Sequence, residues 1–456
     1  MLFNIVVILL MIFISLKIEK KFKIASPLTL IILSILSGIF IKDFLSFTNT
    51  EVFSEEMLVF IVILVLGDAF KLKLKDLKEN YISIIYLAGI SVALAILLGI
   101  LSKEIIFQNL NISIGSLIVL FAMVTATDPV SVVSVFNQYK LPHKLKILAE
   151  GESLFNDAMA LTLFSAFGLY MMNNNQITLN YSLIVSGEIF TGSMIIGIII
   201  GIIGLMLLKT TKDLLSEFVL ILLVAYSAYL LAEHVHIIGN NHLSGLLSEI
   251  IAILTMTTII DKSYRNEKLR YNKEKELITK KIKENNIKIN TNKEKRIDKL
   301  INKFVLDITD IKRQDDIYKF INVISLLANG VLFVSLAHII NFSSLNKYLY
   351  EIISVFILTT IIRISLIGLF KLLSYKVKSI PNINKYWFSI LTLAGIKGGL
   401  SIVMLHILNT TFPEFEFKEM FESIVIGVIL LSTFIYVPLM MLIININQKA
   451  KNNTEI

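Results

Sequence analysis

The chain has no cysteine, so disulfide bonds, thiol chemistry and thiolate metal sites are excluded. It is also poor in charge, because 17% of its residues are charged against about 25% in a usual soluble protein. Strand-like alternation over about ten residues is not seen, which argues against an outer-membrane barrel. Phosphate loops, nucleotide fingerprints and catalytic triads are missing as well, so the sequence predicts neither an enzyme nor an ATP-driven pump, and no cofactor.

Long apolar runs take up most of the sequence instead. Hydrophobic residues make up 55% of the 456 residues, and the mean hydropathy is +0.76. A run of about 20 apolar residues is long enough to cross a bilayer as a helix. We therefore expect an all-α polytopic membrane protein with about 13 transmembrane helices. The expected spans cover 2–16, 24–41, 57–70, 81–102, 113–136, 148–171, 182–208, 214–232, 243–260, 319–341, 348–370, 385–408 and 421–446.

The charges in the short loops alternate along the chain. The loops at 17–23, 71–78 and 140–146 are basic, whereas the loop at 42–56 is acidic. Basic loops stay on the cytoplasmic side of a membrane. We therefore expect a plasma-membrane protein in contact with lipid, with its N-terminus outside and its C-terminus in the cytoplasm. These loops also account for the net charge of +8, so no nucleic-acid partner is expected.

One connection is much longer than the others. Residues 261–318 are rich in Lys, Asn and Glu, and apolar residues recur at helical spacing from Ile297 to Ile311. This pattern is typical of a solvated cytoplasmic helical insert. The alternative is an amphipathic helix that lies on anionic lipid or contacts a regulator.

Two of the apolar runs contain an interruption. The fifth run is broken at Asp128-Pro129, and the penultimate run at Gly395–Ser401. Pro129 has no N–H, so the carbonyl of Thr125 loses its helical partner, and the opened helix exposes oxygens beside the Asp128 carboxylate. Hard cations take such oxygen ligands. A simple kink with Asp128 at a helix end is the alternative. Paired interruptions also predict two inverted repeats.

The sixth run carries four polar residues within six positions. On a helix, Ser153 and Asp157 are i,i+4 neighbours and share a face, and Glu152 and Asn156 share the adjacent face. Ser153 and Asp157 can therefore offer oxygens to one ion, while Asn156 forms hydrogen bonds without adding charge. Polar contacts between helices are the alternative role for all four side chains.

Three further charged residues lie in or beside apolar runs. Asp68 ends the third run, where it is either an interfacial anchor or part of the cation path from the cytoplasm. Arg363 lies deep in an apolar run and needs an acidic partner, for which Glu152 is our choice. Lys397 lies in the glycine-broken run, where it either counters the charge of a helix C-terminus or titrates with the carboxylates. For both cations we expect a structural role.

These motifs resemble those of a known family. Ala126–Phe136 and Leu148–Asp157 resemble the signature pair of NhaP-type sodium/proton antiporters and eukaryotic sodium/proton exchangers. Ala232–His236, Leu243–Gly245 and Gly395–Ser401 are similar to further segments of that family. The resemblance implies that residues 1–456 form one cation/proton exchanger membrane domain and a homodimer of thirteen-helix protomers. The mobile bundle that holds the ion site would comprise about 81–171 and 348–446, and it would contain the two crossed broken helices.

The resemblance also implies roles for single residues. Asp157 and Asp128 would be the ion-binding carboxylates of a sodium site, with Ser153 and the Thr127 carbonyl as further ligands. Asp68 stands where the family usually has Glu. Its contribution to the same site would lie on the cytoplasmic side.

The resemblance further implies a group of residues that would support that ion site without binding the ion. Glu152 and Arg363 would form a stabilising ion pair, and the Asn156-Asp157 pair is the family's mark of electroneutral exchange. Lys397 replaces the usual Arg of the glycine-rich motif, and the two cations are not interchangeable where a bidentate contact is needed.

We therefore expect a secondary active sodium or lithium/proton antiporter. Burial should let Asp157 exchange protons at physiological pH, so that a proton and a cation compete for the same oxygens. Potassium/proton exchange is an alternative, because the ligands alone do not separate the two cations. A cation channel would need a continuous selectivity filter, and no such repeat is seen. A membrane sensor with 261–318 as its contact surface is the third alternative.

Overall fold

The computed structural model of the chain describes residues 2–22, 24–40, 51–108, 110–139, 141–173, 177–208, 210–211, 213–235, 242–258, 308–377 and 380–454. Within these ranges the regular structure is almost entirely helical. A helix satisfies its own backbone hydrogen bonds, which is what an apolar segment in lipid requires.

The first half of the chain forms a succession of apolar helices up to His234. α4, η2 and α5 form one continuous helix, and so do α9, η3 and α10, with a π-helical turn inside each. The elements are α1 (Leu2–Phe22), α2 (Ser26–Phe40), α3 (Glu51–Ala69), α4 (Leu74–Ile84), η2 (Ile85–Ile90), α5 (Ser91–Leu101), α6 (Lys103–Ile106), α7 (Ile114–Thr125), α8 (Pro129–Gln138), α9 (His143–Leu163), η3 (Phe164–Leu169), α10 (Tyr170–Met172), α11 (Leu179–Leu208) and α12 (Leu214–His234).

The second half begins with the apolar helix Gly245–Thr258. Most of the predicted insert 261–318, including most of its predicted amphipathic face, lies outside the described residues; its last residues form the start of α15. The remaining elements are α15 (Ile308–Ile339), α16 (Phe342–Lys347), α17 (Leu349–Lys376), α18 (Lys385–Leu393), α19 (Gly399–Thr411) and α20 (Lys418–Thr454).

The helices agree with the predicted apolar runs. Seven of the described helices are long and apolar enough to cross a membrane, and five shorter apolar helices accompany them. The two predicted interruptions appear as the gaps between α7 and α8 and between α18 and α19.

Several helices extend beyond the apolar run that predicted them. α1 continues to Phe22 and carries Lys20 and Lys21 in its last turn, and α17 ends at Lys376. Lys is a good helix former, and its charge is favourable at a helix C-terminus. Hydropathy alone therefore underestimates the length of these helices, because their polar ends remain helical.

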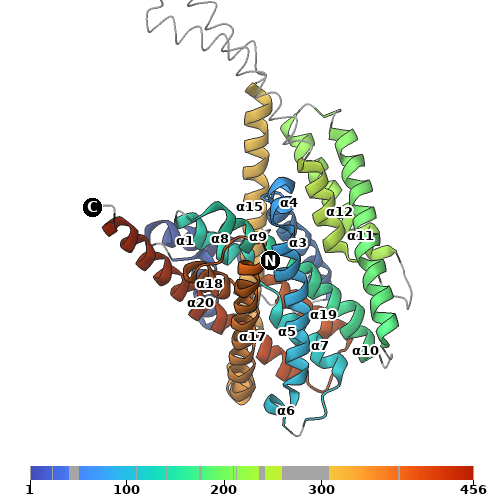
Figure 1. Cartoon of the computed structure of the whole chain (residues 1–456), viewed down its shortest axis with the longest axis vertical. Helices are drawn as coiled ribbons and strands as arrows, with labels where there is room; N and C mark the ends of the chain where they lie inside the picture. Colours follow the sequence, from blue (N-terminus) through green and yellow to red (C-terminus); the bar gives the residue numbers. More distant parts are fainter. Residues whose placement is uncertain are drawn as a thin grey trace, which may run out of the picture.

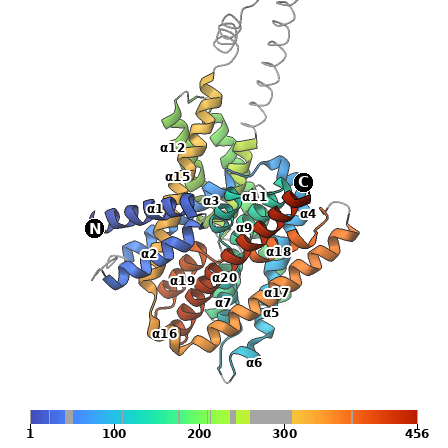
Figure 2. The ribbon, with the colours of Figure 1, turned by 90° about the vertical axis from the view of Figure 1, so that its left-hand side faces the viewer.

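The helices fall into groups that can be followed in the ribbon views. α11 and α12 pack side by side along one edge of the molecule (Figure 1), and α15 packs against α2, α3 and α12. α17 packs against α18 and α20, which lie on the opposite side of the molecule from the α11–α12 pair in Figure 1 and face the viewer in Figure 2. α7 contacts α5, α9, α19 and α20 and so lies at the centre of the fold.

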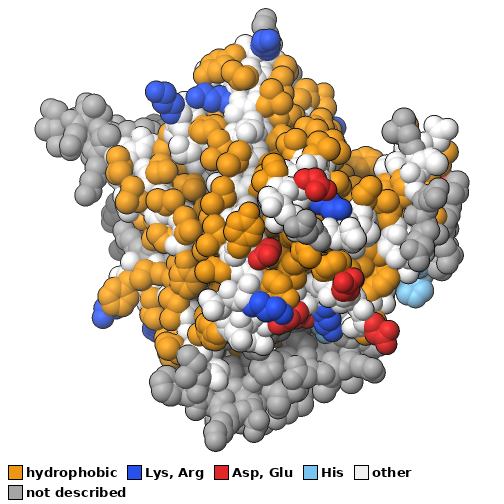
Figure 3. Space-filling view, turned by 90° about the horizontal axis from the view of Figure 1, so that it is seen from below, with side chains coloured by type: hydrophobic (Ala, Val, Ile, Leu, Met, Phe, Trp, Pro, Cys, Tyr) orange, Lys and Arg blue, Asp and Glu red, His pale blue; other side chains and the backbone are white. Residues whose placement is uncertain are grey.

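Burial follows this arrangement. Leu117 to Thr125 of α7 are almost all buried, whereas α11 and α17 expose large apolar side chains such as Ile199 and Ile361. Viewed from the end that carries α6 and α10, hydrophobic side chains cover much of the described surface and charges occur in small groups (Figure 3). An apolar surface around a buried centre is what a lipid environment favours.

Candidate functional site

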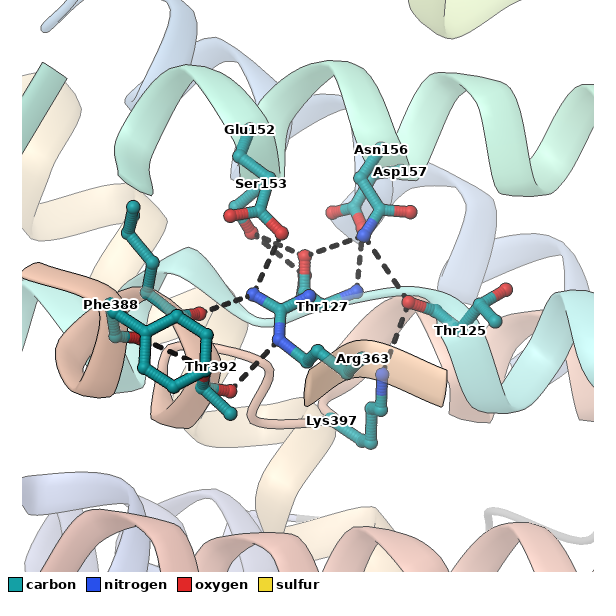
Figure 4. Close-up of polar contacts among 11 residues, drawn as sticks. Thr125, Thr127, Glu152, Ser153, Asn156, Asp157, Arg363, Phe388, Thr392 and Lys397 are labelled. Carbon is teal, nitrogen blue, oxygen red and sulfur yellow. Dashed lines mark hydrogen bonds and ion pairs between the residues drawn. The ribbon is translucent and has the colours of Figure 1, made fainter. Parts of the chain in front are cut away.

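The first interruption separates α7 from α8. α7 ends at Thr125, and Ala126 is extended, with φ −53° and ψ 142°. Because Pro129 has no N–H, the Thr125 carbonyl cannot complete its helical hydrogen bond. It accepts instead from Asn156 Nδ2 at 3.2 Å and from Lys397 Nζ at 3.1 Å (Figure 4). Two side chains from distant parts of the sequence therefore replace the missing backbone donor.

The second interruption, between α18 and α19, meets the first. The Asp128 N–H donates to the Ile396 carbonyl at 2.7 Å. The Ser401 hydroxyl donates to the Met123 carbonyl, near the end of α7, at 2.7 Å. The two unwound segments therefore contact one another and satisfy backbone groups that a broken helix leaves unpaired.

Three polar residues of α9 hold Thr127, at the centre of the first interruption. Asp157 Oδ1 accepts from the Thr127 N–H at 3.2 Å, and the Ser153 hydroxyl donates to the Thr127 carbonyl at 3.1 Å. Asn156 Nδ2 donates to Thr127 Oγ1 at 3.0 Å. The i,i+4 and adjacent positions on α9 thus bring carboxylate, hydroxyl and carbonyl oxygens together (Figure 4).

Asp128 stands at a helix end. Its Oδ2 accepts from the backbone N–H of Ser131 at 3.1 Å and from the Ser131 hydroxyl. This is an N-cap of α8, in which a side-chain oxygen satisfies one of the free N–H groups of the first turn. Asp128 thus lies at a helix end, beside the unwound segment, and its role in ion binding stays a prediction.

A small cavity joins the carboxylates. Asp68 from α3, Thr127 and Asp128 from the interruption, and Asp157 from α9 line a cavity of about 20 Å³, and all four residues are buried. This volume is enough for one water molecule or one small ion. In the described part of the chain, no three Asp, Glu or His side chains converge closely enough to hold a metal ion. A cation here would therefore depend on two carboxylates together with neutral oxygens.

Asp68 has a cationic partner at the start of the following loop. Lys71 Nζ lies 2.9 Å from Asp68 Oδ1. Burial lowers the pKa of the Lys71 ammonium, but the carboxylate of Asp68 and its hydrogen bond raise it, and the net pKa lies above the usual value. Lys71 therefore stays charged, so that it neutralises Asp68 at the edge of the cavity.

Arg363, the buried cation of α17, forms an ion pair with Glu152, the partner that was predicted for it. Arg363 Nη2 lies 2.7 Å from Glu152 Oε1. The same guanidinium also donates to the carbonyls of Thr392 at 2.9 Å and Leu391 at 2.8 Å. These carbonyls end α18, so Arg363 connects α9 with the C-terminus of the helix before the second interruption.

A second polar cavity, of about 40 Å³, lies beside this ion pair. Glu152, Asn156, Arg363 and Lys397 line it, together with Ser91 of α5. Glu152 Oε2 and Asn156 Oδ1 are buried and have no hydrogen-bond partner within the described ranges. Buried polar atoms around a cavity of this size are typically bridged by water. Asn156 therefore lines the second cavity and also donates from its amide nitrogen to Thr127, which lines the first.

A comparison with known families agrees with this geometry. The family model for the transmembrane region of sodium/hydrogen exchangers matches residues 5–240. The chain belongs to this exchanger family. The matched region contains the first interruption and all of α9, from which most of the site is built. The family is one of exchangers, which agrees with the expectation that the chain is not an enzyme.

Curated members of the exchanger family are moderately similar to the chain. The Na⁺/H⁺ antiporter NhaG of Bacillus atrophaeus is 30% identical over 248 residues, which are 52% of this chain and 45% of NhaG. ApNhaP of Aphanothece halophytica, also a Na⁺/H⁺ antiporter, is 30% identical over 191 residues, which are 42% of this chain and 35% of ApNhaP. The matches thus cover less than half of either relative.

The fold is shared over almost the whole length. The structure of the sodium proton antiporter MjNhaP1 from Methanocaldococcus jannaschii superposes with a TM-score of 0.70 at 18% identity, over 97% of this chain and 98% of that chain. The exchanger-family chain is thus a multi-pass membrane protein with the fold of MjNhaP1.

The structure brings the residues singled out in the sequence into two neighbouring groups. Asp68, Thr127, Asp128 and Asp157 line the first cavity, and Ser153 contacts it through Thr127. The supporting residues Glu152, Asn156, Arg363 and Lys397 line the second cavity. Their roles in ion binding stay predictions, whereas the Glu152–Arg363 pair is observed.

Some contributors were not predicted. Asp128 caps α8 by accepting a hydrogen bond from the N–H of Ser131, three positions later, which is the spacing of an N-cap and could have been found in the sequence. The carbonyls of Leu391 and Thr392 that bind Arg363 carry no signal in the sequence, because every residue has a carbonyl.

The contact between the interruptions depends on a glycine. A Cβ atom added to Gly398 would collide with the side chain of Asp128. We therefore expect Gly398→Ala to destabilise the protein by about 1–3 kcal/mol, the usual cost of overpacking, measured as thermal unfolding in detergent. Gly187→Ala in α11 is the matched control, because nothing lies within 4 Å of its added Cβ. Equal melting temperatures for the two variants would show that the contact has room to spare.

Proposed function

We propose that the chain is a secondary active sodium or lithium/proton antiporter. One observation carries the proposal: Asp128 and Asp157, with Asp68 and Thr127, line a single buried cavity at the contact of two interrupted helices. Carboxylates away from water need a counter-charge, which a proton or a small cation supplies. NhaG, ApNhaP and MjNhaP1 are sodium/proton antiporters, which supports the choice of sodium and proton.

Exchange follows from competition for the same oxygens. A proton on Asp157 neutralises the carboxylate, so that a cation loses its principal ligand; a cation on Asp157 displaces the proton. The Ser153 hydroxyl donates to the Thr127 carbonyl at 3.1 Å, and the N–H of Thr127 donates to Asp157 Oδ1. Ser153 Oγ and this carbonyl are therefore our candidates for the neutral ligands that complete the site. Because Asn156 adds no charge, we propose one cation per proton, hence electroneutral exchange.

Alternating access requires that the site face each side of the membrane in turn. We propose that a bundle of about 81–171 and 348–446 moves against the rest of the chain, within thirteen spans related as two inverted repeats. The dense hydrogen bonding between the two interruptions, through Asp128 and Ser401, supports their moving as one unit. A homodimer in the plasma membrane, with the N-terminus outside and the C-terminus in the cytoplasm, completes the proposal.

The test is proton flux in proteoliposomes that contain the purified protein. An inward sodium gradient should drive protons outward, lithium should substitute for sodium, and the rate should not change when a membrane potential is imposed with a potassium ionophore. A rate that follows the potential would contradict electroneutral exchange while leaving antiport intact.

The same assay separates the alternatives. Preference for potassium over sodium would indicate potassium/proton exchange, and cation flux without proton movement would indicate a channel. If neither ion moves, while a known antiporter reconstituted in parallel is active, a sensor function replaces the proposed antiport.

A further inference from the structure

A buried carboxyl group lies outside the candidate ion site. Glu249 is on the helix Gly245–Thr258, and its exposed fraction is 0%. Among the residues that the structure describes, neither of its two carboxylate oxygens has a hydrogen-bond partner. The residue does not line the cavity of Asp128 and Asp157, and the mechanism proposed above makes no use of it.

The surroundings of Glu249 are densely packed. On α11, a Cβ atom added to Gly197 would lie 2.5 Å from the carbonyl oxygen of Ser248, and one added to Gly201 would lie 2.7 Å from that of Ala252. The backbones of α11 and of the Gly245–Thr258 helix therefore touch on both sides of Glu249. Ser248 is also fully buried, and its hydroxyl has no partner.

In the part of the chain that the structure describes, no cationic side chain pairs with the carboxyl group of Glu249. The titratable groups within its electrostatic range are the phenols of Tyr226 and Tyr229 on α12, and Glu233 lies within range of Tyr229. A phenol at neutral pH carries no positive charge, and a second carboxylate cannot offset a negative one.

The carboxyl group of Glu249 is therefore either a neutral acid or an anion without a counter-charge. An ionised carboxylate without a partner in a dry interior is far more costly than its protonated form. A metal cation is not a suitable substitute, because sodium-sized ions need several oxygen ligands and Glu249 offers two. A proton needs only one of these oxygens.

We propose that Glu249 is a second proton-binding site, occupied at neutral pH and insensitive to the transported cation. It lies in the scaffold of α11, α12 and Gly245–Thr258 rather than between the interrupted helices. At alkaline pH the loss of this proton leaves a charge in tight packing, so the Gly245–Thr258 helix must shift or admit water. Through this site, a rise in pH on either side of the membrane thus changes the packing of the scaffold helices.

Infrared difference spectroscopy tests the proposal without any transport assay. Subtracting the spectrum of Glu249→Gln from that of the wild type at neutral pH should reveal the carbonyl stretch of a protonated carboxylic acid. The same band should persist in saturating sodium chloride. Glu416→Gln is the matched control: Glu416 is exposed, so its removal should take away carboxylate bands only. The proposal is overturned if Glu249→Gln lacks a carboxylate band of the wild type and not an acid band. It is also overturned if sodium chloride removes the acid band.

A stability measurement gives an independent readout. The unfolded chain releases a glutamate proton above about pH 4.3, whereas the folded chain is proposed to retain it. The wild type should therefore lose stability relative to Glu249→Leu as the pH rises above that value, and the gap in melting temperature should widen. A gap that stays constant with pH contradicts the proposal. So does a Glu249→Gln variant that fails to fold, because the amide matches the neutral acid in shape and charge. Neither result bears on the proposed antiport.

Discussion

Asp157→Asn is expected to reduce sodium-driven proton flux to the background of empty liposomes. The amide can still accept the hydrogen bond from the Thr127 N–H, which Asp157 Oδ1 now accepts at 3.2 Å, so the interruption should keep its shape. What is lost is the charge. An amide neither binds a transferable proton nor offsets the cost of stripping water from a cation in a buried cavity.

The pH dependence of the wild type should show the same competition. When one proton and one cation share a carboxylate, the apparent sodium affinity falls about tenfold for each pH unit on the acidic side of the titration. Fluorescence-detected proton flux at several sodium concentrations and pH values measures this slope. Ser153→Ala should lower the sodium affinity but keep the slope, because it removes a neutral oxygen and leaves the titrating group.

Controls separate this effect from misfolding. The melting temperature of Asp157→Asn in detergent should equal or exceed that of the wild type, because a buried charge has been removed. Glu416→Gln, at an exposed carboxylate between α19 and α20, should exchange normally. Wild-type exchange by Asp157→Asn would place the proton-coupled step elsewhere, and the candidate site would lose its central residue.

The sequence predicted the interruptions well because their cause is local. Pro129 lacks an N–H wherever it stands, so the opening after Thr125 follows from two adjacent positions. The i,i+4 relation of Ser153 and Asp157 is equally local, since any helix puts these side chains on one face. Arg363, deep in an apolar run, needed an acidic partner. Because acidic residues are uncommon in apolar runs, Glu152 was one of only a few candidates.

Contacts between distant segments could not be predicted in the same way. Lys397 donates to the Thr125 carbonyl, 272 positions away. The sequence had left open whether this ammonium counters a helix C-terminus or titrates with the carboxylates, and only the packing of the interrupted helices places it at the end of α7. Glu249 lies within the predicted run 243–260, but the run alone does not show that this carboxyl group is buried without a partner, because that depends on the packing of α11 and α12.

The Glu152–Arg363 pair should dominate stability among the polar contacts. Arg363→Ala removes the partner of the Glu152 carboxylate and the donors to the carbonyls of Thr392 and Leu391 together. Breaking a buried ion pair by removal of one partner costs about 3–5 kcal/mol. We therefore expect a large drop in the temperature of thermal unfolding in detergent.

The order of the melting temperatures of several variants separates the contribution of the ion pair from that of the carbonyl contacts. Arg363→Lys keeps the charge but lacks the planar fork that reaches three acceptors, so it should be intermediate. Glu152→Gln leaves the carbonyl contacts intact and should cost less than Arg363→Ala. In Lys347→Ala, which breaks the exposed 2.8 Å pair with Glu419, the melting temperature should barely change, because solvent screens such pairs. The melting temperature of Arg363→Ala could instead equal that of Lys347→Ala and not fall below that of Arg363→Lys. In that case the buried pair does not hold α9 to the end of α18, and the backbone contacts with Asp128 must position the second interruption.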